Sequence, residues 1–291
     1  MLQQTRVEAV IPYYERFLAK YPTPAAFAAA SESEVLTAWA GLGYYSRARN
    51  LHKAAQQITD AGAFPKTYDA IHQLPGIGDY TAAAVSSIAF QLPHAALDGN
   101  VARVLARLTN DPGDIKAPVT RNRLQIVANT LVDHRHPGDF NQGMMELGAL
   151  VCTPRDPSCL LCPIASHCEA RRAGTERDLP IRSGSGPKIE ESHTLLVILR
   201  HGSLLLRQRK NNSARLKGFW EIPALGDLPN AILGDELGRF RHAIVNHIYR
   251  FTVVTASIEG DPIDYRWTPL HKLHEIPLST TAKKAVLCLQ Y

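Results

Sequence analysis

The sequence predicts two domains of different fold class, a mainly α-helical part followed by an α+β part. Up to about residue 170 apolar residues recur at helical spacing, and strand-like alternation is nearly absent. Residues 173–192 are rich in Gly, Ser, Pro and charge, which is typical of a linker. Beyond it, β-branched and alternating segments predict strands. We therefore place domains at residues 1–172 and 193–291, joined by a linker at 173–192.

The individual elements follow from the same patterns. A helix is expected near Glu34 to Trp39, and another over the Ala-rich residues 81–90, because alanine has the highest helix propensity. A third is expected over residues 101–108, whose apolar side chains have i, i+3, i+4, i+7 spacing. The strands expected in the second domain cover residues 193–199, 203–209 and 250–257, separated by Gly-containing turn clusters.

Composition sets the broad class of protein. The chain has 291 residues with 45% hydrophobic content, enough for two ordinary cores, and a formal net charge of +5. That charge is compatible with nucleic-acid binding without demonstrating it. No apolar run reaches the roughly 18 residues of a membrane span, and no secretory signal precedes the first domain. We expect a cytoplasmic, nucleoid-associated monomer with no membrane partner.

Four cysteines form the most specific motif. Cys152, Cys159, Cys162 and Cys168 have C-x6-C-x2-C-x5-C spacing, with prolines between them. Thiolate-only ligation suits zinc or an iron–sulfur cluster, and zinc sites usually consist of two short knuckles flanking a longer loop. The compact spacing favours a [4Fe–4S] cluster. Two disulfides are disfavoured because the chain shows no secretory segment and Cys288 lies far away.

A second motif, Leu74-Pro75-Gly76-Ile77-Gly78-Asp79-Tyr80-Thr81, places two glycines just before the Ala-rich helix. Such a turn presents backbone N–H groups at a helix N-terminus, which can bind phosphate. The same pattern also occurs as a plain turn.

A third motif is Asp98-Gly99-Asn100, directly before the helix over residues 101–108. Taken alone, Asp98 or Asn100 would most simply cap that helix. A carboxylate at a helix N-terminus also stays ionised, which suits a group that faces a developing cation.

The glycine turn followed by the cysteine run resembles the helix-hairpin-helix glycosylase superfamily, which includes endonuclease III. Within it, three further segments look like the adenine DNA glycosylase (MutY) family: residues 1–5 (MLQQT), 41–50 (GLGYYSRARN) and 140–149 (FNQGMMELGA). The resemblance covers residues 1–170. It implies a helix-hairpin-helix glycosylase domain with a [4Fe–4S] cluster held by Cys152, Cys159, Cys162 and Cys168.

The resemblance also implies roles for residues of the catalytic centre. Asp98 matches the catalytic aspartate, which stabilises or traps the oxocarbenium ion. Members with lyase activity carry a nucleophilic Lys where this chain has Tyr80, so cleavage should be monofunctional. Tyr80 and Asn100 would help to position the reacting centre.

Contacts to DNA follow from the same resemblance. Gln3, Gln4 and Tyr44 are the expected intercalators around the mispair, with Arg47 and Arg49 as expected phosphate contacts. The hairpin would grip the backbone through Gly76, Gly78 and Thr81. Of Tyr44 and Tyr45, one is expected to be ordinary aromatic core.

The second domain resembles Nudix hydrolases, and residues 193–291 are called the Nudix-like domain below. Residues 218–223 (GFWEIP) match the pattern, but the metal-binding G-x5-E-x7-R-E-x-x-E-E run is absent, so nucleotide hydrolysis is not expected. The resemblance implies a reader of 8-oxoguanine, at a segment that is Val245-Asn246-His247 here and Phe-Ser-His in many relatives. Asn246 and His247 could instead be simple turn residues.

The expected function is removal of adenine mispaired with 8-oxoguanine or guanine in double-stranded DNA. The alternatives are a catalytically silent lesion-binding protein and a glycosylase or lyase for oxidised pyrimidines. In the family, the general acid is a Glu two residues before the Met of the MLQQT segment, and that Met is residue 1 here. We therefore expect this chain to bind the mispair and to excise adenine slowly or not at all.

Overall fold

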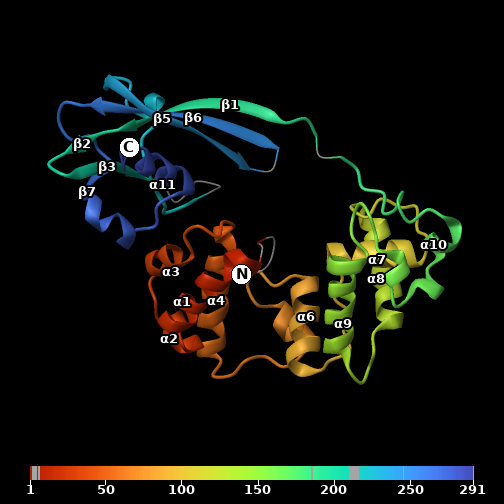
Figure 1. Ribbon diagram of the computed structural model, residues 1–291. Helices are drawn as coiled ribbons and strands as arrows, with labels where there is room; N and C mark the ends of the chain where they lie inside the picture. The colour runs from red at the N-terminus through yellow and green to blue at the C-terminus, as the bar shows by residue number, and fades with distance from the viewer. Residues whose placement is uncertain (2–4, 6, 185, 210–215, 245, 291) are drawn as a thin grey trace. The chain divides into compact units, whose positions relative to one another are not determined.

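The computed structural model describes the chain except residues 2–4, 6, 185, 210–215, 245 and 291 (Figure 1). The chain forms two compact units. The first combines Met1–Asp60 with Ser185–Tyr291, and the second is Ala61–Gly184. Among the described residues, no helix is long and apolar enough to cross a membrane.

The N-terminal helices of the first unit are α1 (Val7–Lys20), α2 (Pro24–Ala28), α3 (Glu32–Trp39) and α4 (Tyr45–Asp60). Their starts follow from capping. Thr23 Oγ1 accepts from the Ala26 N–H, and Ser31 and Glu34 form a reciprocal capping box at the start of α3. Edge-to-face aromatic contacts of Phe17 with Phe27 and Trp39 fill the core between these helices.

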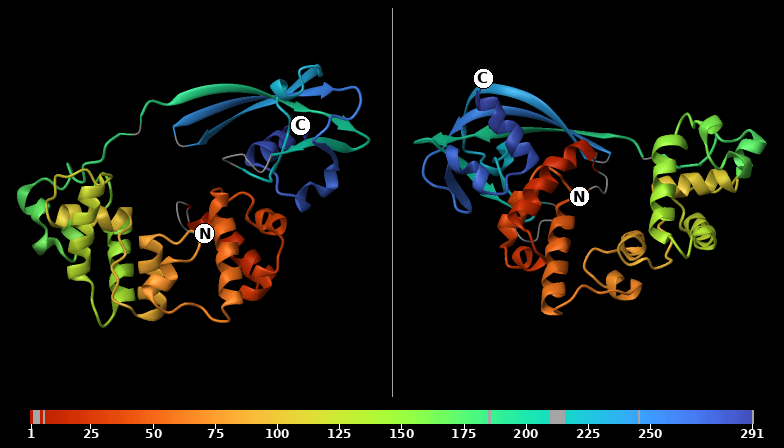
Figure 2. Two further views of the ribbon diagram at one scale, coloured as in Figure 1. Left: turned by 180° about the vertical axis from the view of Figure 1, so that it is seen from behind. Right: turned by 60° about the horizontal axis from the view of Figure 1, so that its bottom comes forward.

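The Nudix-like domain contributes two sheets to the same unit (Figure 2). The strands are β1 (Ile189–Val197), β2 (Leu199–Arg200), β3 (Ser203–Gln208), β4 (Trp220–Glu221), β5 (Ile232–Ile244), β6 (His247–Ser257) and β7 (Tyr265–Pro269). The first sheet has the order β1-β6-β5, with β1 and β6 parallel and β5 and β6 antiparallel. In the second, β3 pairs with β2, β4 and β7, all antiparallel. The short 3-10 helices η4 (Leu225–Asp227), η5 (Leu270–Glu275) and η6 (Cys288–Gln290) and helix α11 (Thr280–Leu287) complete the domain.

The second unit is helical. Its α-helices are α5 (Tyr68–His72), α6 (Asp79–Phe90), α7 (Gly99–Leu108), α8 (Pro118–Leu131), α9 (Pro137–Glu146) and α10 (Glu169–Ala173). A π-helical turn, η1 (Leu147–Val151), extends α9, and η2 (Cys159–Leu161) and η3 (Ala165–His167) shape the cysteine loop. Leu105 of α7 and Leu124 of α8 are fully buried in the core between these helices.

The predicted fold class is confirmed: a mainly α part precedes an α+β part. The three helices expected from the sequence correspond to α3, α6 and α7, and the expected strands to β1 with β2, to β3 and to β6. Strand β1 begins at Ile189, within the segment predicted as a linker. The domain boundaries at 172 and 193 remain predictions.

Candidate catalytic and DNA-binding site

The glycine turn joins α5 to α6 as a helical hairpin. Gly76 has a φ of +75°, a left-handed conformation that suits glycine, and Gly78 is the N-cap residue of α6. A Cβ at Gly78 would meet no atom within 4 Å, so the space in front of this helix start is open. Thr81 lies in the first turn of α6. Backbone N–H groups at an open helix N-terminus are suited to binding a phosphate.

One acidic side chain at this hairpin, that of Asp79, was not assigned a role from the sequence. Asp79, the first residue of α6, has a side chain that is 89% exposed and accepts from His72 Nε2 at 2.9 Å. A carboxylate is favourable beside the positive end of a helix dipole but repels a DNA phosphate. When His72 is protonated, its charge offsets that repulsion.

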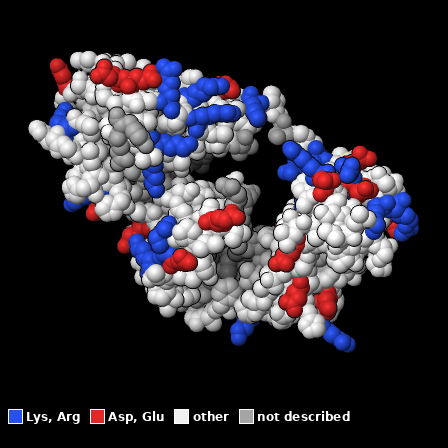
Figure 3. All heavy atoms as spheres, viewed as in Figure 1, with Lys and Arg blue, Asp and Glu red and all other residues white. Residues whose placement is uncertain are grey.

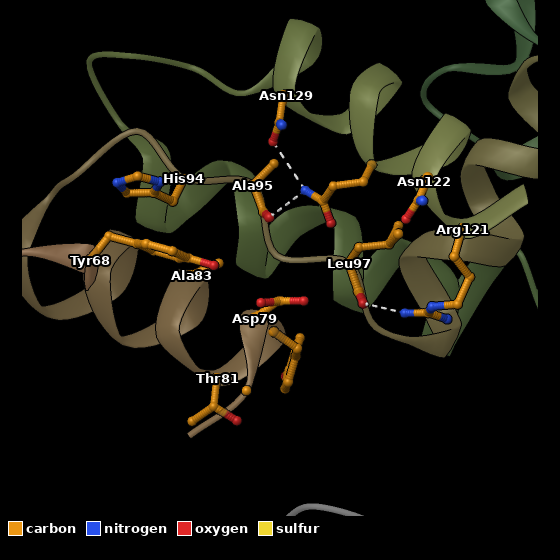
Figure 4. A pocket seen from close by; sticks show the side chains of 13 residues that line it. Tyr68, Asp79, Thr81, Ala83, His94, Ala95, Leu97, Arg121, Asn122 and Asn129 are labelled. Atoms are coloured by element: carbon orange, nitrogen blue, oxygen red, sulfur yellow. Dashed lines mark hydrogen bonds between the residues drawn. The ribbon is translucent and has the colours of Figure 1, made fainter. Parts of the chain in front are cut away.

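A pocket of about 550 Å³ lies beside the hairpin (Figure 4). Tyr68 and His94 stack at its wall, with ring centroids 4.4 Å apart. Arg121 from α8 donates to the Leu97 carbonyl at 3.0 Å, next to the start of α7. Tyr80 lines this pocket, whereas Asp98 is not among its lining residues. The predicted catalytic carboxylate of Asp98 is therefore not part of the pocket wall, although its neighbour Leu97 is.

Asp98 and Tyr80 lie close enough to interact electrostatically. Asp98 Oδ1 accepts from the Val101 N–H at 2.7 Å, which makes Asp98 the N-cap of α7. The Tyr80 hydroxyl donates to Met145 Sδ at 3.4 Å. Burial, and then the carboxylate of Asp98, raise the pKa of Tyr80. Tyr80 is therefore a neutral phenol whose pKa the Asp98 carboxylate influences.

Asn100, the third predicted catalytic residue, is held by an arginine that the sequence predictions did not include. Arg103 Nη2 donates to Asn100 Oδ1 at 2.9 Å and to the Gly148 carbonyl at 2.7 Å. Its Nε donates to the Cys152 carbonyl at 2.8 Å. Burial lowers the pKa of Arg103. Arg103 therefore connects the start of α7 to the first cysteine. The signal in the sequence that could have identified Arg103 is a charged residue on an otherwise apolar helix.

The four cysteines of the predicted cluster line one small cavity, together with Arg107 and Glu176. All four are free thiols, and Arg107 Nη1 donates to Cys152 Sγ at 3.2 Å. Burial, then Glu176 and the other three cysteines, raise the pKa of Cys159. In the part of the chain that the structure describes, no three His, Cys, Asp or Glu side chains are arranged to hold a single metal ion.

The predicted intercalating loop places its two tyrosines differently. Tyr44 is 54% exposed and has a φ of +49°, while Tyr45 is buried, as expected for one of the pair. The Arg47 guanidinium lies 4.7 Å from the Tyr44 ring centroid and supports it by a cation–π contact. Arg49 forms an ion pair with Glu32 at 2.7 Å and also donates to the Lys217 carbonyl. Gln3 and Gln4 lie outside the described residues.

The predicted 8-oxoguanine reader lies at the turn between β5 and β6. Val245 is outside the described residues, and the Asn246 carbonyl accepts from the Ile189 N–H at 2.8 Å. His247, the first residue of β6, pairs through Nδ1 with Glu191 Oε1 at 3.0 Å. Thus Asn246 and His247 are turn-associated residues, and the latter has an acidic partner.

Basic side chains gather over this sheet (Figure 3). Arg241 of β5 lies directly opposite Arg250 of β6, and both are exposed. Arg250 also pairs with Glu190 at 3.0 Å, so part of its charge is offset. The remaining positive charge suits an anionic partner.

Comparisons with known proteins give relatives along most of the chain. Residues 1–129 match the family described as "HhH-GPD superfamily base excision DNA repair protein". The adenine DNA glycosylase of Mus musculus is 45% identical over an alignment of 356 residues, covering 98% of this chain and 69% of that protein. The Homo sapiens adenine DNA glycosylase is 33% identical over 358 residues, with 98% and 65% coverage.

Among solved structures, a thermostable thymine-DNA glycosylase is similar at 31% identity with a TM-score of 0.53, covering 59% of this chain and 80% of that chain. The hairpin and these matches define a helix-hairpin-helix protein that is similar to base excision DNA repair proteins. Within that class, the chain belongs to the adenine DNA glycosylase family. It spans about two thirds of the length of the human and mouse relatives, 65% and 69% respectively.

Proposed function

We propose that this chain is a monofunctional DNA N-glycosylase that removes adenine mispaired with 8-oxoguanine or guanine. The observation that carries the proposal is Tyr80 in the first turn of α6, directly after the glycine turn of the hairpin. The hairpin position where lyases carry a nucleophilic Lys holds a half-buried phenol, which cannot form a Schiff base. The relatives that align with 98% of the chain are named adenine DNA glycosylases, which supports adenine as the base that is removed.

The chemistry assigned to these residues is stabilisation of a cation. The adenine is flipped out of the duplex and takes a proton from water at N7, and the bond between N9 and C1′ then breaks with oxocarbenium character and releases neutral adenine. Asp98, at the N-terminus of α7, supplies the negative charge that faces this cation. Tyr80 and Asn100 hold the reacting sugar and water in place, and water completes the hydrolysis with retention.

The four cysteines fit a [4Fe–4S] cluster because their thiols line one cavity and none is used in a disulfide. When bound, the cluster would have a structural role, because the hydrolysis needs no electron transfer. Arg107, which donates to Cys152 Sγ, would stabilise the thiolate form of that ligand.

DNA is held by three groups of residues under this proposal. The hairpin residues Gly76, Gly78 and Thr81 bind backbone phosphate, with Arg47 and Arg49 as additional contacts. Gln3, Gln4 and Tyr44 enter the duplex at the mispair. Asn246 and His247 read the oxidised base, since the Asn side chain offers both a donor and an acceptor to its N7–H and O8. The protein acts as a monomer in the cytoplasm, at the nucleoid.

The test is a single-turnover assay on labelled duplexes containing A:8-oxoguanine, A:G or an oxidised pyrimidine, with binding measured in parallel. Adenine release, even at the low rate expected without the family's general acid, that yields a strand break only after alkali supports the proposal. Tight binding without release supports the silent lesion binder, and direct nicking at the pyrimidine supports the lyase. The double variant Asn246→Ala/His247→Ala should reduce the preference for 8-oxoguanine over guanine, because base-edge contacts contribute about 1–3 kcal/mol each.

A further inference from the structure

We propose that Glu191 is a positioning residue for 8-oxoguanine recognition, because its carboxylate holds the His247 ring in one orientation and one tautomer at the β5–β6 turn. The inference rests on the proposed function of Asn246 and His247 as the reader. It adds a residue outside that turn, on β1, to the recognition of the oxidised base.

The parallel pairing of β1 and β6 places the two residues together. Ile189 is in register with His247, and Glu191 with Tyr249. Alternate residues of neighbouring strands share one face of a sheet, so Glu191 and His193 lie on the same face as His247. Glu191 Oε1 is 3.0 Å from His247 Nδ1, and Glu191 Oε2 is 3.4 Å from His193 Nε2. One carboxylate therefore bridges two imidazoles.

The carboxylate selects a tautomer. Hydrogen bonds, first of all that from His247, lower the pKa of Glu191, so it is ionised at neutral pH and can only accept. His247 must then carry its proton on Nδ1. This leaves Nε2 to face a nucleotide, as an acceptor in the neutral ring and as a donor in the protonated ring.

Aromatic stacking fixes the plane of the ring. His247 lies 5.8 Å from Tyr249 with an interplanar angle of 13°, and Tyr249 lies 6.2 Å from Phe251. His193 packs against Phe251 at 5.7 Å. This row of rings continues from the domain core, which Phe251 contacts, to the turn. Rotation of His247 away from Glu191 would break both the hydrogen bond and the stack.

The surroundings of the pair contain other titratable groups. His242 on β5 is in register with Tyr249, and burial, then Lys284 of α11, lower the pKa of His242. The side chains of His247 and Glu191 are 29% and 39% exposed, so a nucleotide can reach them.

Glu190 provides a matched control. It is the neighbour of Glu191 on β1, and it points to the opposite face, where it pairs with Arg250 at 3.0 Å. Replacing either glutamate with alanine removes one carboxylate from the same strand, together with the Arg250 contact of Glu190 or the His193 and His247 contacts of Glu191. Only Glu191→Ala removes the partner of His247.

The experiment measures dissociation constants for duplexes with a non-hydrolysable 2′-fluoro adenosine opposite 8-oxoguanine or guanine. The preference is the dissociation constant of the guanine duplex divided by that of the 8-oxoguanine duplex. Glu191→Ala should reduce this ratio about threefold to tenfold, the effect of losing roughly one hydrogen bond. Glu190→Ala should leave the ratio within about twofold. Glu191→Gln, whose amide oxygen still accepts from Nδ1, should fall between the parent and Glu191→Ala.

A second readout separates positioning from folding. Nitrogen-15 NMR of the His247 ring in the free protein should show the Nδ1-protonated tautomer in the parent and in Glu190→Ala, and a tautomer mixture in Glu191→Ala. If Asn246→Ala/His247→Ala leaves the ratio unchanged, the reader itself is wrong. If that double variant reduces the ratio and Glu191→Ala does not, or if Glu190→Ala reduces it equally, the role of Glu191 is overturned.

Discussion

Arg107 Nη1 donates to the sulfur of Cys152 across 3.2 Å. The same guanidinium donates to the carbonyls of Thr153 at 2.7 Å, Pro154 at 3.1 Å and Leu179 at 2.8 Å, and the residue is only 2% exposed. Arg107 lies on α7, the helix that Asp98 caps. One helix therefore carries the proposed catalytic carboxylate at its start and holds the cysteine loop farther along.

Replacing Arg107 with methionine should destabilise the fold by about 2–5 kcal/mol, because three carbonyls, that of Leu179 among them buried, lose their donor. Iron content should fall with it, since the loop would no longer be fixed around the four thiols. Thermal unfolding and iron analysis of the purified protein measure both effects.

Arg177→Met is the control for Arg107→Met. Arg177 is 75% exposed and pairs with Asp156 at 3.1 Å, so its loss should change stability by no more than about 1 kcal/mol. Equal behaviour of the two variants would show that the buried guanidinium does not organise the loop.

The sequence alone was sufficient to predict helix α7, but not to predict which residues its arginines contact. Apolar spacing over residues 101–108 predicted the helix, because periodicity is a local property. Arg103 and Arg107 are buried on that helix by contacts with residues 45 to 72 positions away, which no local pattern contains. Likewise the turn glycines predicted the hairpin, but not the hydrogen bond between His72 and Asp79.

Strand β5 was missed for a different physical reason. Its outward positions carry Arg239 and Arg241, and most of its residues are exposed or half-buried. Register shifts between Leu233 and Gly238 also interrupt the alternation that marks a half-buried strand. Cross-strand pairing with β6 determines this element, so the sequence of the segment alone did not predict it.

Phe219→Ala should cost about 3–5 kcal/mol of folding free energy, the usual range for truncating a buried Phe. Phe219 is fully buried in the cluster formed with the N-terminal helices, and its ring centroid lies 4.2 Å from that of Tyr45. Urea unfolding measures the loss. Ile263→Ala, at a position that is 89% exposed, should change stability by about 0.5 kcal/mol or less. Similar values for both would contradict the burial of Phe219.

Two glycines near the end of α9 should respond to alanine in opposite directions. At Gly148 a Cβ would lie 2.7 Å from Asn100 Cβ and 3.0 Å from the Asn100 carbonyl oxygen, so the backbone must move, at about 1–3 kcal/mol. At Gly143, inside α9, a Cβ meets no atom within 4 Å, and alanine should stabilise the helix by about 0.5–1 kcal/mol.

The Gly148→Ala variant should also excise adenine more slowly, because the displaced Asn100 lies two residues from Asp98. Thermal unfolding and single-turnover excision of both variants test this pair. Stabilisation by Gly148→Ala would show that η1 does not approach the start of α7 closely.

Asp98→Asn separates the capping role of Asp98 from its charge. Asn caps helices about as well as Asp, so stability at neutral pH should change by about 0.5 kcal/mol or less. Excision should fall about 10²–10³-fold, the effect of removing one electrostatic stabiliser of the transition state. Asp98→Ala should lose the cap as well, at about 1 kcal/mol.

The same substitution should change the titration of Tyr80. Its pKa is raised in the folded state by burial and then by the Asp98 carboxylate, so removing that charge should lower the pKa toward the ordinary value of about 10. A raised folded-state pKa gives stability that is complete below the unfolded pKa and is lost as pH rises through the folded one. Asp98→Asn should therefore lose less stability than the parent above about pH 10. Ultraviolet difference titration against Tyr80→Phe isolates the phenol. An unchanged Tyr80 titration in Asp98→Asn would mean that the two side chains do not interact, and the shared catalytic centre would then lose its structural basis.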